Sequence, residues 1–509
     1  MLSIFDIGPP PPCPAPFNLA AHVLGRVAQH PDKTALEVLN RDGSSDRWSF
    51  ADLQGAVLST ARGLAETGLE PGGVVLLRLG NTVDFPIAYL GAIAAGMVPV
   101  PTSTQLTAAE TAAMIDMIAP AAVLHDPVTA TAPHPRTIDI GALRDMRSGP
   151  QAQGFQMGDP ERLGYIVFTS GTSGKPRAVM HAHRAIWARQ MMMQGWYGLG
   201  AEDRLLHAGA FNWTYTLGTG LMDPWTMGAT ALIPEPGTDL ADIPVLLASH
   251  RATIFAAAPG VYRKILNAET ATRIDGLRHG LTAGEKLSPD LAKAWQAATG
   301  TTLFEAYGMS ECSTFISASP THPAKPGALG RPQDGRRVAI LDAQGDPVLL
   351  GEHGVIAVSR RDPGLMLGYL GQPDETRARM VGDWFITGDM GAMDENGQID
   401  YLGRNDDMMN AGGYRVSPLE VEAALSEFDG IIQVGVTEVE VKQGASVIAA
   451  FYTADAPITE DALRAFAQDR LARYKQPRMF VHLDSLPTGA NGKLTRRALK
   501  PLAPKPQEA

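Results

Sequence analysis

A run of hydroxyl-bearing residues and glycines at positions 169–174 is the segment of this chain best suited to chemistry. Such residues can donate hydrogen bonds to phosphate oxygens at low steric cost, and the lysine that follows adds positive charge. We therefore predict that ATP phosphates bind to Thr169, Ser170, Gly171, Thr172, Ser173, Gly174 and Lys175. The segment is not a Walker A loop, because Thr169 and Pro176 stand where that pattern needs a glycine and a Ser or Thr. A polar surface loop is the alternative.

A second lysine with possible chemistry, Lys493, lies more than three hundred residues further along the chain. It ends the run Pro487–Lys493, which contains Gly489 and Gly492. Taken alone, a lysine near a C-terminus is expected to have a solvated side chain. The distance between the two segments indicates instead that a mobile C-terminal piece completes the site, as in a two-domain enzyme that activates a substrate with ATP.

The composition excludes several classes of protein. The chain has 509 residues, which exceeds what one core usually supports, and its 45% apolar and 19% charged residues are typical of a globular protein. A formal charge of −11 opposes non-specific binding to nucleic acid or anionic lipid. Cys13 and Cys312 are the only cysteines, which favours a reducing compartment, and we expect the cytoplasm. Neither a signal peptide nor a transmembrane segment is expected.

The elements that must position these residues alternate between strands and helices. Strand patterns near 74–79, 98–101 and 121–124 are separated by helical patterns, and strand patterns recur at 164–168, 229–233 and 253–257. This succession predicts parallel α/β layers. From about residue 328 the pattern changes to short strands, and turn sequences at 342–345 and 394–397 predict hairpins in a β-rich subdomain.

A small C-terminal unit follows. Ser417 as N-cap, Pro418 at the first helical position and Glu420 three residues after the cap predict a helix that begins with a capping box. Strand patterns near 446–453 and 479–483 flank a helix from about 460 to 474. We therefore predict an α/β fold with two domains, an AMP-binding domain at 1–404 with the β-rich subdomain and a mobile α+β lid at 405–509.

The motifs resemble those of a known family. Tyr165–Pro176 is similar to the signature loop of the adenylate-forming superfamily, which contains acyl-CoA synthetases, peptide-synthetase adenylation domains and luciferases. Five further segments resemble family motifs in the family's order, namely Thr282–Leu287, Tyr307–Glu311, Thr387–Asp389, Gly403–Asp407 and Pro487–Lys493. The resemblance spans nearly the whole chain, and it is closest to the benzoate-CoA ligase-like enzymes.

The resemblance implies roles around ATP. Mg²⁺ needs an oxygen ligand that is ionised at neutral pH, and Glu311 is expected to supply it, with Ser310 near the reacting phosphate. Asp389 and Arg404 are expected at the ribose, although they could instead cap turns or pair with other charges. The remaining residues expected to bind ATP or AMP are Gly284, Glu285, Lys286, Tyr307 and Gly308.

The same resemblance assigns roles in the C-terminal unit. Lys493 is expected to neutralise charge at the carboxylate and the α-phosphate during adenylation. Asp406 matches the hinge about which the small domain rotates between the two half-reactions. Gly412, Gly413 and Tyr414 would then line the path of the CoA thiol, with Arg415 contacting phosphate.

The acid pocket is the part of the site that the sequence defines least sharply. Phe211, Trp213 and Tyr215 follow His207 where the family builds its acyl pocket, and with Ala283 and Phe315 they predict an apolar slot lined by aromatic rings. These aromatics could equally belong to the core. The segments contain no obvious Lys or Arg for a second carboxylate, which disfavours dicarboxylic acids.

Two other features could suggest different chemistry. His181 and His183 form a His-x-His pair without further residues at zinc-ligand spacing, so a zinc site is not predicted. Cys312 lies beside Glu311, but no base accompanies it and a packing role is favoured over a nucleophile.

Together these observations predict a carboxylic acid–CoA ligase that uses ATP and Mg²⁺. The acid, aryl or short to medium acyl, would form acyl-AMP and pyrophosphate, and CoA would then release AMP as the thioester forms. One alternative is an adenylating enzyme that loads the pantetheine of a carrier protein, and another is a nucleotide-binding protein without turnover. The identity of the acid and the choice between monomer and homodimer stay open.

Overall fold

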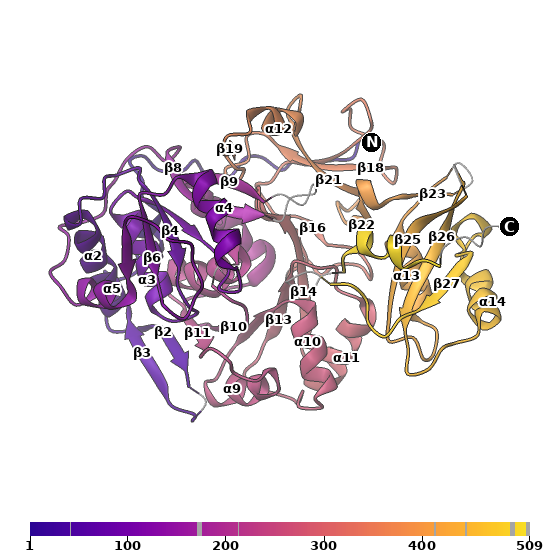
Figure 1. Ribbon diagram of the computed structural model, residues 1–509, viewed down its shortest axis with the longest axis horizontal. Helices are drawn as coiled ribbons and strands as arrows, with labels where there is room; N and C mark the ends of the chain where they lie inside the picture. Colours follow the sequence, from indigo (N-terminus) through magenta and orange to yellow (C-terminus); the bar gives the residue numbers. More distant parts are fainter. Residues whose placement is uncertain are drawn as a thin grey trace. The chain divides into compact units, whose positions relative to one another are not determined.

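The computed structural model describes residues 1–40, 42–169, 176–211, 213–411, 414–442, 445–488 and 494–504. The chain divides into two compact units (Figure 1). The large unit contains residues 5–338 and 358–385, and the small unit contains 1–4, 339–357 and 386–509. The predicted α/β class, with a large N-terminal and a small C-terminal part, is confirmed. The domain boundary after residue 404 stays a prediction.

The principal sheet of the large unit has the strand order β16-β15-β14-β13-β12-β10-β11-β2-β3. Pairing is parallel from β14 to β2 and antiparallel at both edges. The strands are β2 (Thr34–Leu39), β3 (Ser45–Ser49), β10 (Arg204–His207), β11 (Thr230–Pro234), β12 (Ile254–Ala257), β13 (His279–Ala283), β14 (Thr302–Met309), β15 (Ser313–Ser317) and β16 (Arg331–Pro332). Helices α9 (Ile243–Ser249), α10 (Pro259–Asn267) and α11 (Pro289–Thr299) lie along this sheet (Figure 1), and one face packs against their apolar residues.

A second, parallel sheet has the order β5-β4-β6-β7. The chain runs β4 (Val74–Arg78), α3 (Asp84–Ala94), β5 (Val98–Pro101), α4 (Ala108–Ile118), β6 (Ala122–His125), β7 (Thr137–Asp139) and α5 (Ile140–Arg147). The predicted β-α-β-α-β succession is therefore confirmed. Every residue of α3 is buried, because the helix packs into the apolar core beside α2 (Phe50–Glu66).

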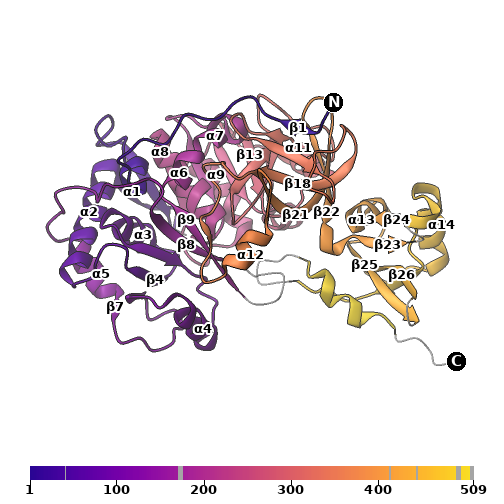
Figure 2. The same ribbon diagram turned by 90° about the horizontal axis from the view of Figure 1, so that it is seen from above.

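A third sheet, with the order β19-β9-β8, frames the predicted phosphate segment. β8 (Leu163–Thr169) pairs antiparallel with β9 (Arg177–Ala182), and β9 pairs with β19 (Gly368–Tyr369), which leads to α12 (Pro373–Ala378). Figure 2 shows β8 and β9 side by side. We refer to this third sheet below as the β8–β9–β19 sheet.

A further sheet contains residues that belong to both units. Its strands are β1 (Ile4–Phe5), β17 (Val338–Leu341), β18 (His353–Ser359), β20 (Met380–Val381), β21 (Trp384–Met393) and β22 (Ile399–Arg404). Both predicted turns are present, since Asp342 and Asp394 each donate a backbone hydrogen bond to a residue four positions later at 3.0 Å or less. The β-rich pattern predicted from residue 328 is thus confirmed.

The C-terminal part of the small unit contains β23 (Met409–Ala411), β24 (Tyr414–Val416), α13 (Pro418–Ser426), β25 (Gln433–Lys442), β26 (Ala445–Thr453), α14 (Glu460–Arg470) and β27 (Met479–His482). Ser417 is the N-cap of α13, and its hydroxyl accepts the Glu420 N–H, as predicted. The predicted capping box is only half formed, because the Glu420 carboxylate is engaged in an ion pair with Lys475.

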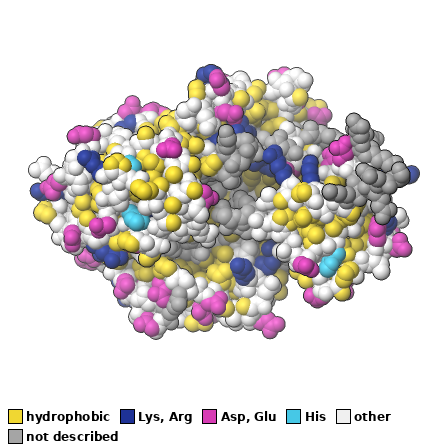
Figure 3. All heavy atoms as spheres, in the orientation of Figure 1, with side chains coloured by type: hydrophobic (Ala, Val, Ile, Leu, Met, Phe, Trp, Pro, Cys, Tyr) yellow, Lys and Arg dark blue, Asp and Glu magenta, His cyan; other side chains and the backbone are white. Residues whose placement is uncertain are grey.

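Charged side chains of both signs lie on the face shown in Figure 3. Acidic side chains are spread over this face, with basic ones between them. None of the helices in the described ranges is long and apolar enough to cross a membrane.

Candidate active site

The ends of the predicted phosphate segment are fixed by the β8–β9–β19 sheet. Thr169, the last residue of β8, pairs with Arg177, the first residue of β9. Residues Ser170 to Lys175, which join the two strands, lie outside the described residues, so their predicted contacts with ATP stay a prediction. The Arg177 guanidinium lies 5.2 Å from the centre of the Tyr369 ring and forms a 2.8 Å ion pair with Glu375.

The predicted metal ligand lies on a tight turn between β14 and β15. Gly308 is required there, since a Cβ at this position would stand 2.1 Å from the Ser313 carbonyl oxygen. Ser313 has a φ of 61°, which few residues other than glycine adopt. The turn closes with a 3.1 Å hydrogen bond from the Cys312 N–H to the Met309 carbonyl.

Glu311, at the tip of this turn, is held by a phenol. Its side chain is buried at 7% exposure, and Oε1 accepts a 2.7 Å hydrogen bond from the Tyr369 hydroxyl. Burial, reinforced by the Glu311 carboxylate, raises the pKa of Tyr369, so the phenol stays protonated and donates. The Glu311 carbonyl accepts a 2.7 Å hydrogen bond from the Met366 N–H. The carboxylate is therefore oriented before any ligand binds.

The neighbouring Ser310 is held by a histidine. The Ser310 carbonyl oxygen lies 2.7 Å from His181 Nε2, and the imidazole stacks on Tyr165 at 4.8 Å. Burial lowers the pKa of His181 to about 4, so a neutral ring donates this bond. The predicted residues Ser310 and Glu311 thus lie together beside β9 and β19.

The predicted ATP- or AMP-binding residues Gly284 and Lys286 follow the end of β13, and Tyr307 lies near the end of β14. Tyr307 packs edge to face on Phe315, with ring centres 5.4 Å apart. Lys286 forms a 2.8 Å ion pair with Glu305, whose pKa is raised by burial. Glu285 is half-buried beside it. The Lys286 ammonium is therefore already engaged by a carboxylate, and its predicted contact with ATP stays a prediction.

Only part of the predicted acid pocket lies together. Trp213 and Tyr215 pack at 5.1 Å with perpendicular rings, and Trp213 covers Gly284, where a Cβ would come within 2.8 Å of the indole. Ala283 belongs to the same apolar cluster. Phe211 instead packs on Phe85 in another core, and the fully buried Phe315 lies behind Tyr307.

Small residues form the floor beneath these rings. Ala256, Ala283 and Ala306 are buried on one face of the principal sheet, at the carboxyl ends of β12, β13 and β14. The Tyr215 hydroxyl donates to the Leu281 carbonyl at 3.1 Å, which fixes the ring above them. Ligands of open parallel sheets bind outside the carboxyl ends of the strands, which is the edge where these residues lie.

His207 adds a polar group to this pocket, a role that its place in the sequence did not predict. Its Nδ1 accepts a 2.9 Å hydrogen bond from the Gly209 N–H, and burial lowers its pKa to about 3. The neutral ring therefore carries its proton on Nε2. That nitrogen is buried and has no hydrogen-bond partner among the described residues, and the ring lies 4.5 Å from Tyr215.

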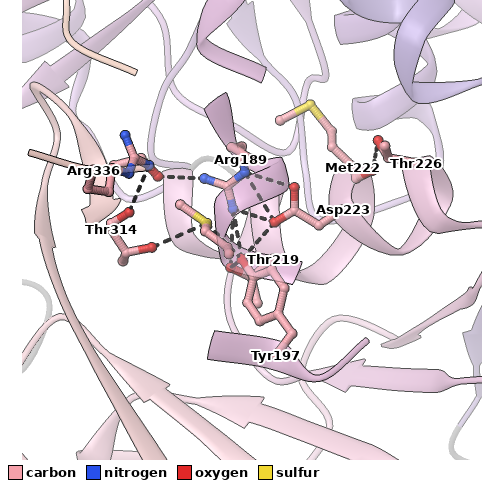
Figure 4. Close-up of polar contacts among 10 residues, drawn as sticks. Arg189, Tyr197, Thr219, Met222, Asp223, Thr226, Thr314 and Arg336 are labelled. Atoms are coloured by element: carbon pink, nitrogen blue, oxygen red, sulfur yellow. Dashed lines mark hydrogen bonds and ion pairs between the residues drawn. The ribbon is translucent and has the colours of Figure 1, made fainter. Parts of the chain in front are cut away.

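A buried ion pair supports the turn after Glu311, and no sequence motif predicted it. Arg189 contacts both carboxylate oxygens of Asp223 at 2.6 to 3.1 Å and donates to the Ser313 hydroxyl at 2.6 Å. Figure 4 shows the guanidinium pointing at Asp223 with Tyr197 beside it, and the Tyr197 hydroxyl donates to Asp223 at 2.7 Å. The only signal in the sequence was that Arg189 and Asp223 are each a charged residue within an apolar run.

A second buried pair lies next to the first. Arg336 pairs with Asp362. It also donates to the Thr314 carbonyl at 3.2 Å (Figure 4). Cys312 is fully buried, with its sulfur 3.7 Å from Asp362, and burial raises the pKa of its thiol. A buried thiol with a raised pKa is a packing residue, which agrees with the role favoured from the sequence.

The predicted ribose contacts lie in the small unit. Asp389 on β21 is directly opposite Arg404 on β22, and their side chains form an ion pair of 3.1 Å. The Asp389 N–H donates to the Thr387 hydroxyl at 3.0 Å, and the Tyr401 hydroxyl lies 3.5 Å from the carboxylate. The structure thus brings the two residues together as an ion pair, and their predicted contacts with the ribose stay a prediction.

The remaining predicted residues are only partly described. Asp406 lies in the short 3₁₀ helix Asn405–Asp407, and Tyr414 and Arg415 begin β24. Gly412 and Gly413, between β23 and β24, and Lys493 lie outside the described residues. The flanks of the segment that carries Lys493 are joined, since Thr488 and Leu494 form a β-bridge and the Thr495 N–H donates to the Pro487 carbonyl at 2.9 Å.

The histidine pair does not converge on a common point. His181 bonds Ser310, whereas His183 Nδ1 accepts the Leu19 N–H at 3.0 Å. Across the described ranges, no group of three or more His, Cys, Asp or Glu side chains is arranged to hold a metal ion.

Comparison with known proteins agrees with this arrangement. The model of the AMP-binding enzyme family matches residues 24–370, and that of the AMP-binding enzyme C-terminal domain matches residues 420–493. Acyl-coenzyme A synthetase ACSM5, mitochondrial, of Mus musculus is 30% identical, with 96% of this chain and 91% of that protein covered.

Solved structures give the same result. ATP-bound MatB from Rhodopseudomonas palustris has a TM-score of 0.87 at 26% identity, with 95% of this chain and 98% of that chain covered. A benzoate CoA ligase from Burkholderia xenovorans LB400 has a TM-score of 0.84 at 27% identity, with 95% and 100% covered. The predicted resemblance and the predicted ligase class are confirmed. The chain belongs to the AMP-binding enzyme family and is a carboxylic acid–CoA ligase.

Proposed function

We propose that this ligase activates a small monocarboxylic acid, aromatic in the first instance, with ATP and Mg²⁺, and transfers the acyl group to CoA. The carboxylate oxygen attacks the α-phosphorus, and the bond to pyrophosphate breaks to leave acyl-AMP. The CoA sulfur then attacks the acyl carbon and AMP leaves. The observation that carries the proposal is the fixed Glu311 carboxylate, held by the same sheet that fixes the ends of the phosphate segment.

The residues present fit a magnesium ion that also binds phosphate. Mg²⁺ is usually bound by one or two carboxylates together with substrate phosphates, and Glu311 offers one buried, oriented carboxylate. When bound, the ion neutralises charge on the phosphate oxygens. Ser310, on the same turn, would contact the reacting phosphate.

The ribose and the charge that develops during adenylation are assigned to the small unit. Asp389 would accept the ribose hydroxyls, with Arg404 beside it, and Lys493 would stabilise charge at the α-phosphate. We also propose that Asp406 is the hinge of a lid at 405–509, which presents Gly412, Gly413 and Tyr414 to the CoA thiol, with Arg415 on phosphate, in the second half-reaction.

The pocket residues support an aromatic or short acyl group. Trp213 and Tyr215 pack with perpendicular rings, and three buried alanines belong to the same apolar cluster, which supports a small apolar acyl group. Residues 211–216 and 282–284 contain no Lys or Arg that could pair with a second carboxylate. A solved relative is a benzoate CoA ligase, which makes benzoate the first acid to test.

Location and assembly are also proposals. Cys13 and Cys312 are both free thiols, which supports a reducing compartment such as the cytoplasm, although the mouse relative is mitochondrial by name. Whether the protein is a monomer or a homodimer can be measured by light scattering.

A CoA-ligation screen tests the acid and the acceptor. Purified protein is supplied with ATP, Mg²⁺ and either benzoate, substituted benzoates, C4 to C10 aliphatic acids or dicarboxylic acids, and AMP is measured with free CoA or with a pantetheinylated carrier protein. We expect AMP release with benzoate-like acids and free CoA. Release that requires the carrier protein, or turnover confined to dicarboxylic acids, would contradict the proposal.

The two half-reactions can be separated with one variant. Lys493→Ala should slow carboxylate-dependent pyrophosphate exchange by about a hundredfold or more, while thioester formation from supplied acyl-AMP persists. Lys500→Ala is a matched control near the same terminus. If both half-reactions fell equally in a folded Lys493→Ala protein, the assigned role would be wrong.

A further inference from the structure

The β8–β9–β19 sheet holds both the ends of the phosphate segment and the Ser310–Glu311 turn. It pairs Thr169 with Arg177, which fixes the ends of the phosphate segment. It also supplies both side chains that bond the Ser310–Glu311 turn, because His181 is on β9 and Tyr369 is on β19. The position of Glu311 is thereby set relative to Thr169 and Arg177 through one sheet.

Tyr369 is the more informative of the two side chains. It is 2% exposed, and its hydroxyl lies 2.7 Å from Glu311 Oε1. Its own N–H donates to the Thr376 hydroxyl at 2.9 Å, which ties the strand to α12. A protonated phenol that donates to a carboxylate makes a charge-assisted hydrogen bond, which fixes the rotamer of the carboxylate.

Arg177 connects this phenol to the phosphate segment. The guanidinium lies over the Tyr369 ring at 5.2 Å, and its Nη2 forms an ion pair with Glu375 at 2.8 Å. A cation placed on the ring face restrains the ring from one side. Glu311, Tyr369 and Arg177 thus form a continuous chain of contacts.

We propose that Tyr369 is a positioning residue, which orients Glu311 as a ligand for the magnesium ion that accompanies ATP. The inference rests on the proposed role of Glu311. Tyr369 itself touches neither ATP nor the metal, and it acts by holding one carboxylate oxygen so that the other faces the ion. Substitution of outer partners of this kind typically costs about 10- to 100-fold in metal affinity or activity.

The substitution Tyr369→Phe removes only the hydroxyl and tests the proposal. The half-saturating Mg²⁺ concentration for acid-dependent ATP–pyrophosphate exchange should rise by about tenfold. The maximal rate should recover at high Mg²⁺, and the KM for the acid should stay unchanged. Calorimetry gives a readout besides activity, since MgATP should bind about tenfold more weakly while ATP in EDTA binds as to the wild-type protein.

Tyr262→Phe is the matched control. Tyr262 is fully buried in the same unit, and its hydroxyl donates to the Phe255 and Leu281 carbonyls at 2.8 and 3.0 Å. Its loss should lower the melting temperature without changing the Mg²⁺ dependence. If Tyr369→Phe behaved like Tyr262→Phe, with lower stability and an unchanged Mg²⁺ requirement, the positioning role would be refuted.

Glu311→Gln separates this inference from the function on which it rests. If Glu311→Gln leaves the binding of MgATP and the Mg²⁺ dependence unchanged, the proposed role of Glu311 itself fails. If Glu311→Gln weakens MgATP binding and Tyr369→Phe does not, the role of Glu311 stands and that of Tyr369 falls. Weakening by both variants, with the larger effect from Glu311→Gln, is the expected result.

Discussion

Two Arg–Asp pairs in this protein have the same chemistry and opposite surroundings. In the large unit, the side chains of Arg189 and Asp223 are 10% and 1% exposed. In the small unit, those of Arg404 and Asp389 are 38% and 9% exposed. The first pair bonds the turn that carries Glu311, and the second lies on a strand edge where the ribose is proposed to bind.

The difference in exposure suggests that the two ion pairs have separate tasks. A buried pair cannot exchange its partner without leaving a charge in an apolar core, so it fixes geometry. A half-exposed pair contributes little to stability and can yield its partner to a ligand. The turn proposed to hold the metal is accordingly preformed, whereas the pair proposed to bind the ribose can trade an internal ion pair for contacts with the nucleotide.

Breaking the buried pair should have the largest effect. Asp223→Asn leaves the Arg189 guanidinium buried and unpaired, which should lower the free energy of unfolding by about 3–5 kcal/mol. Urea unfolding measures this. Glu202→Gln is the control, because Glu202 is 95% exposed in its pair with Lys33 and should change stability by less than about 0.5 kcal/mol. Equal effects of the two substitutions on the free energy of unfolding would contradict the contrast between buried and exposed ion pairs.

The next largest effect should come from acid, which should lower the stability of the large unit through its buried His207. The pKa of His207 is lowered to about 3 in the folded protein, so the unfolded chain takes up this proton below about pH 6.5 while the folded chain does not. Stability from this residue is therefore present above pH 6.5 and is lost as the pH falls toward 3.

At pH 5 the loss for His207 is about 2 kcal/mol, from 1.36 kcal/mol per pH unit. Unfolding of the wild type and of His207→Gln, measured from pH 7.5 to 5, should differ in slope by about one proton. Parallel curves would mean that His207 is already charged in the folded protein.

Substitution in the exposed pair should affect binding more than folding. Asp389→Asn should raise the KM for ATP by about tenfold, equivalent to about 1.4 kcal/mol, and change the free energy of unfolding by less than about 1 kcal/mol. Steady-state kinetics and urea unfolding of the same preparation measure both. A large loss of stability with an unchanged KM would assign Asp389 to the fold instead of the ribose.

The smallest change isolates the link between the buried pair and the turn. Ser313→Ala keeps the pair of Arg189 with Asp223 but removes the hydroxyl that accepts from Arg189 at 2.6 Å. The free energy of unfolding should fall by about 1 kcal/mol, with a smaller rise in the Mg²⁺ requirement than Tyr369→Phe causes. An Mg²⁺ requirement higher than that of Tyr369→Phe would move the main support of Glu311 from the β8–β9–β19 sheet to Arg189.

The alternation of strands and helices was predictable because apolar runs and turn residues mark it locally. The predicted β-α-β-α-β succession and the N-cap at Ser417 are found, and the capping box failed only because Lys475, distant in sequence, engages Glu420. Short motifs likewise single out Glu311, Asp389 and Arg404 in the sequence. Such signals lie in a few adjacent residues.

Contacts between distant residues left no comparable signal. Phe211 and Trp213 are two positions apart, yet Phe211 packs on Phe85 while Trp213 covers Gly284. Tyr369 has the sequence surroundings of any core aromatic, and only the contact of its hydroxyl with Glu311 distinguishes it. Tertiary packing decides these positions, and a sequence without aligned relatives does not contain that information.

Acid-dependent exchange of labelled pyrophosphate into ATP tests the central claim most directly. The wild-type protein should catalyse exchange with benzoate or a related aromatic acid, in the presence of Mg²⁺ and without CoA, since adenylation precedes the thiol step. Exchange that needs no acid, or thioester formation from acid and ATP that yields no exchange and no AMP, would contradict the account.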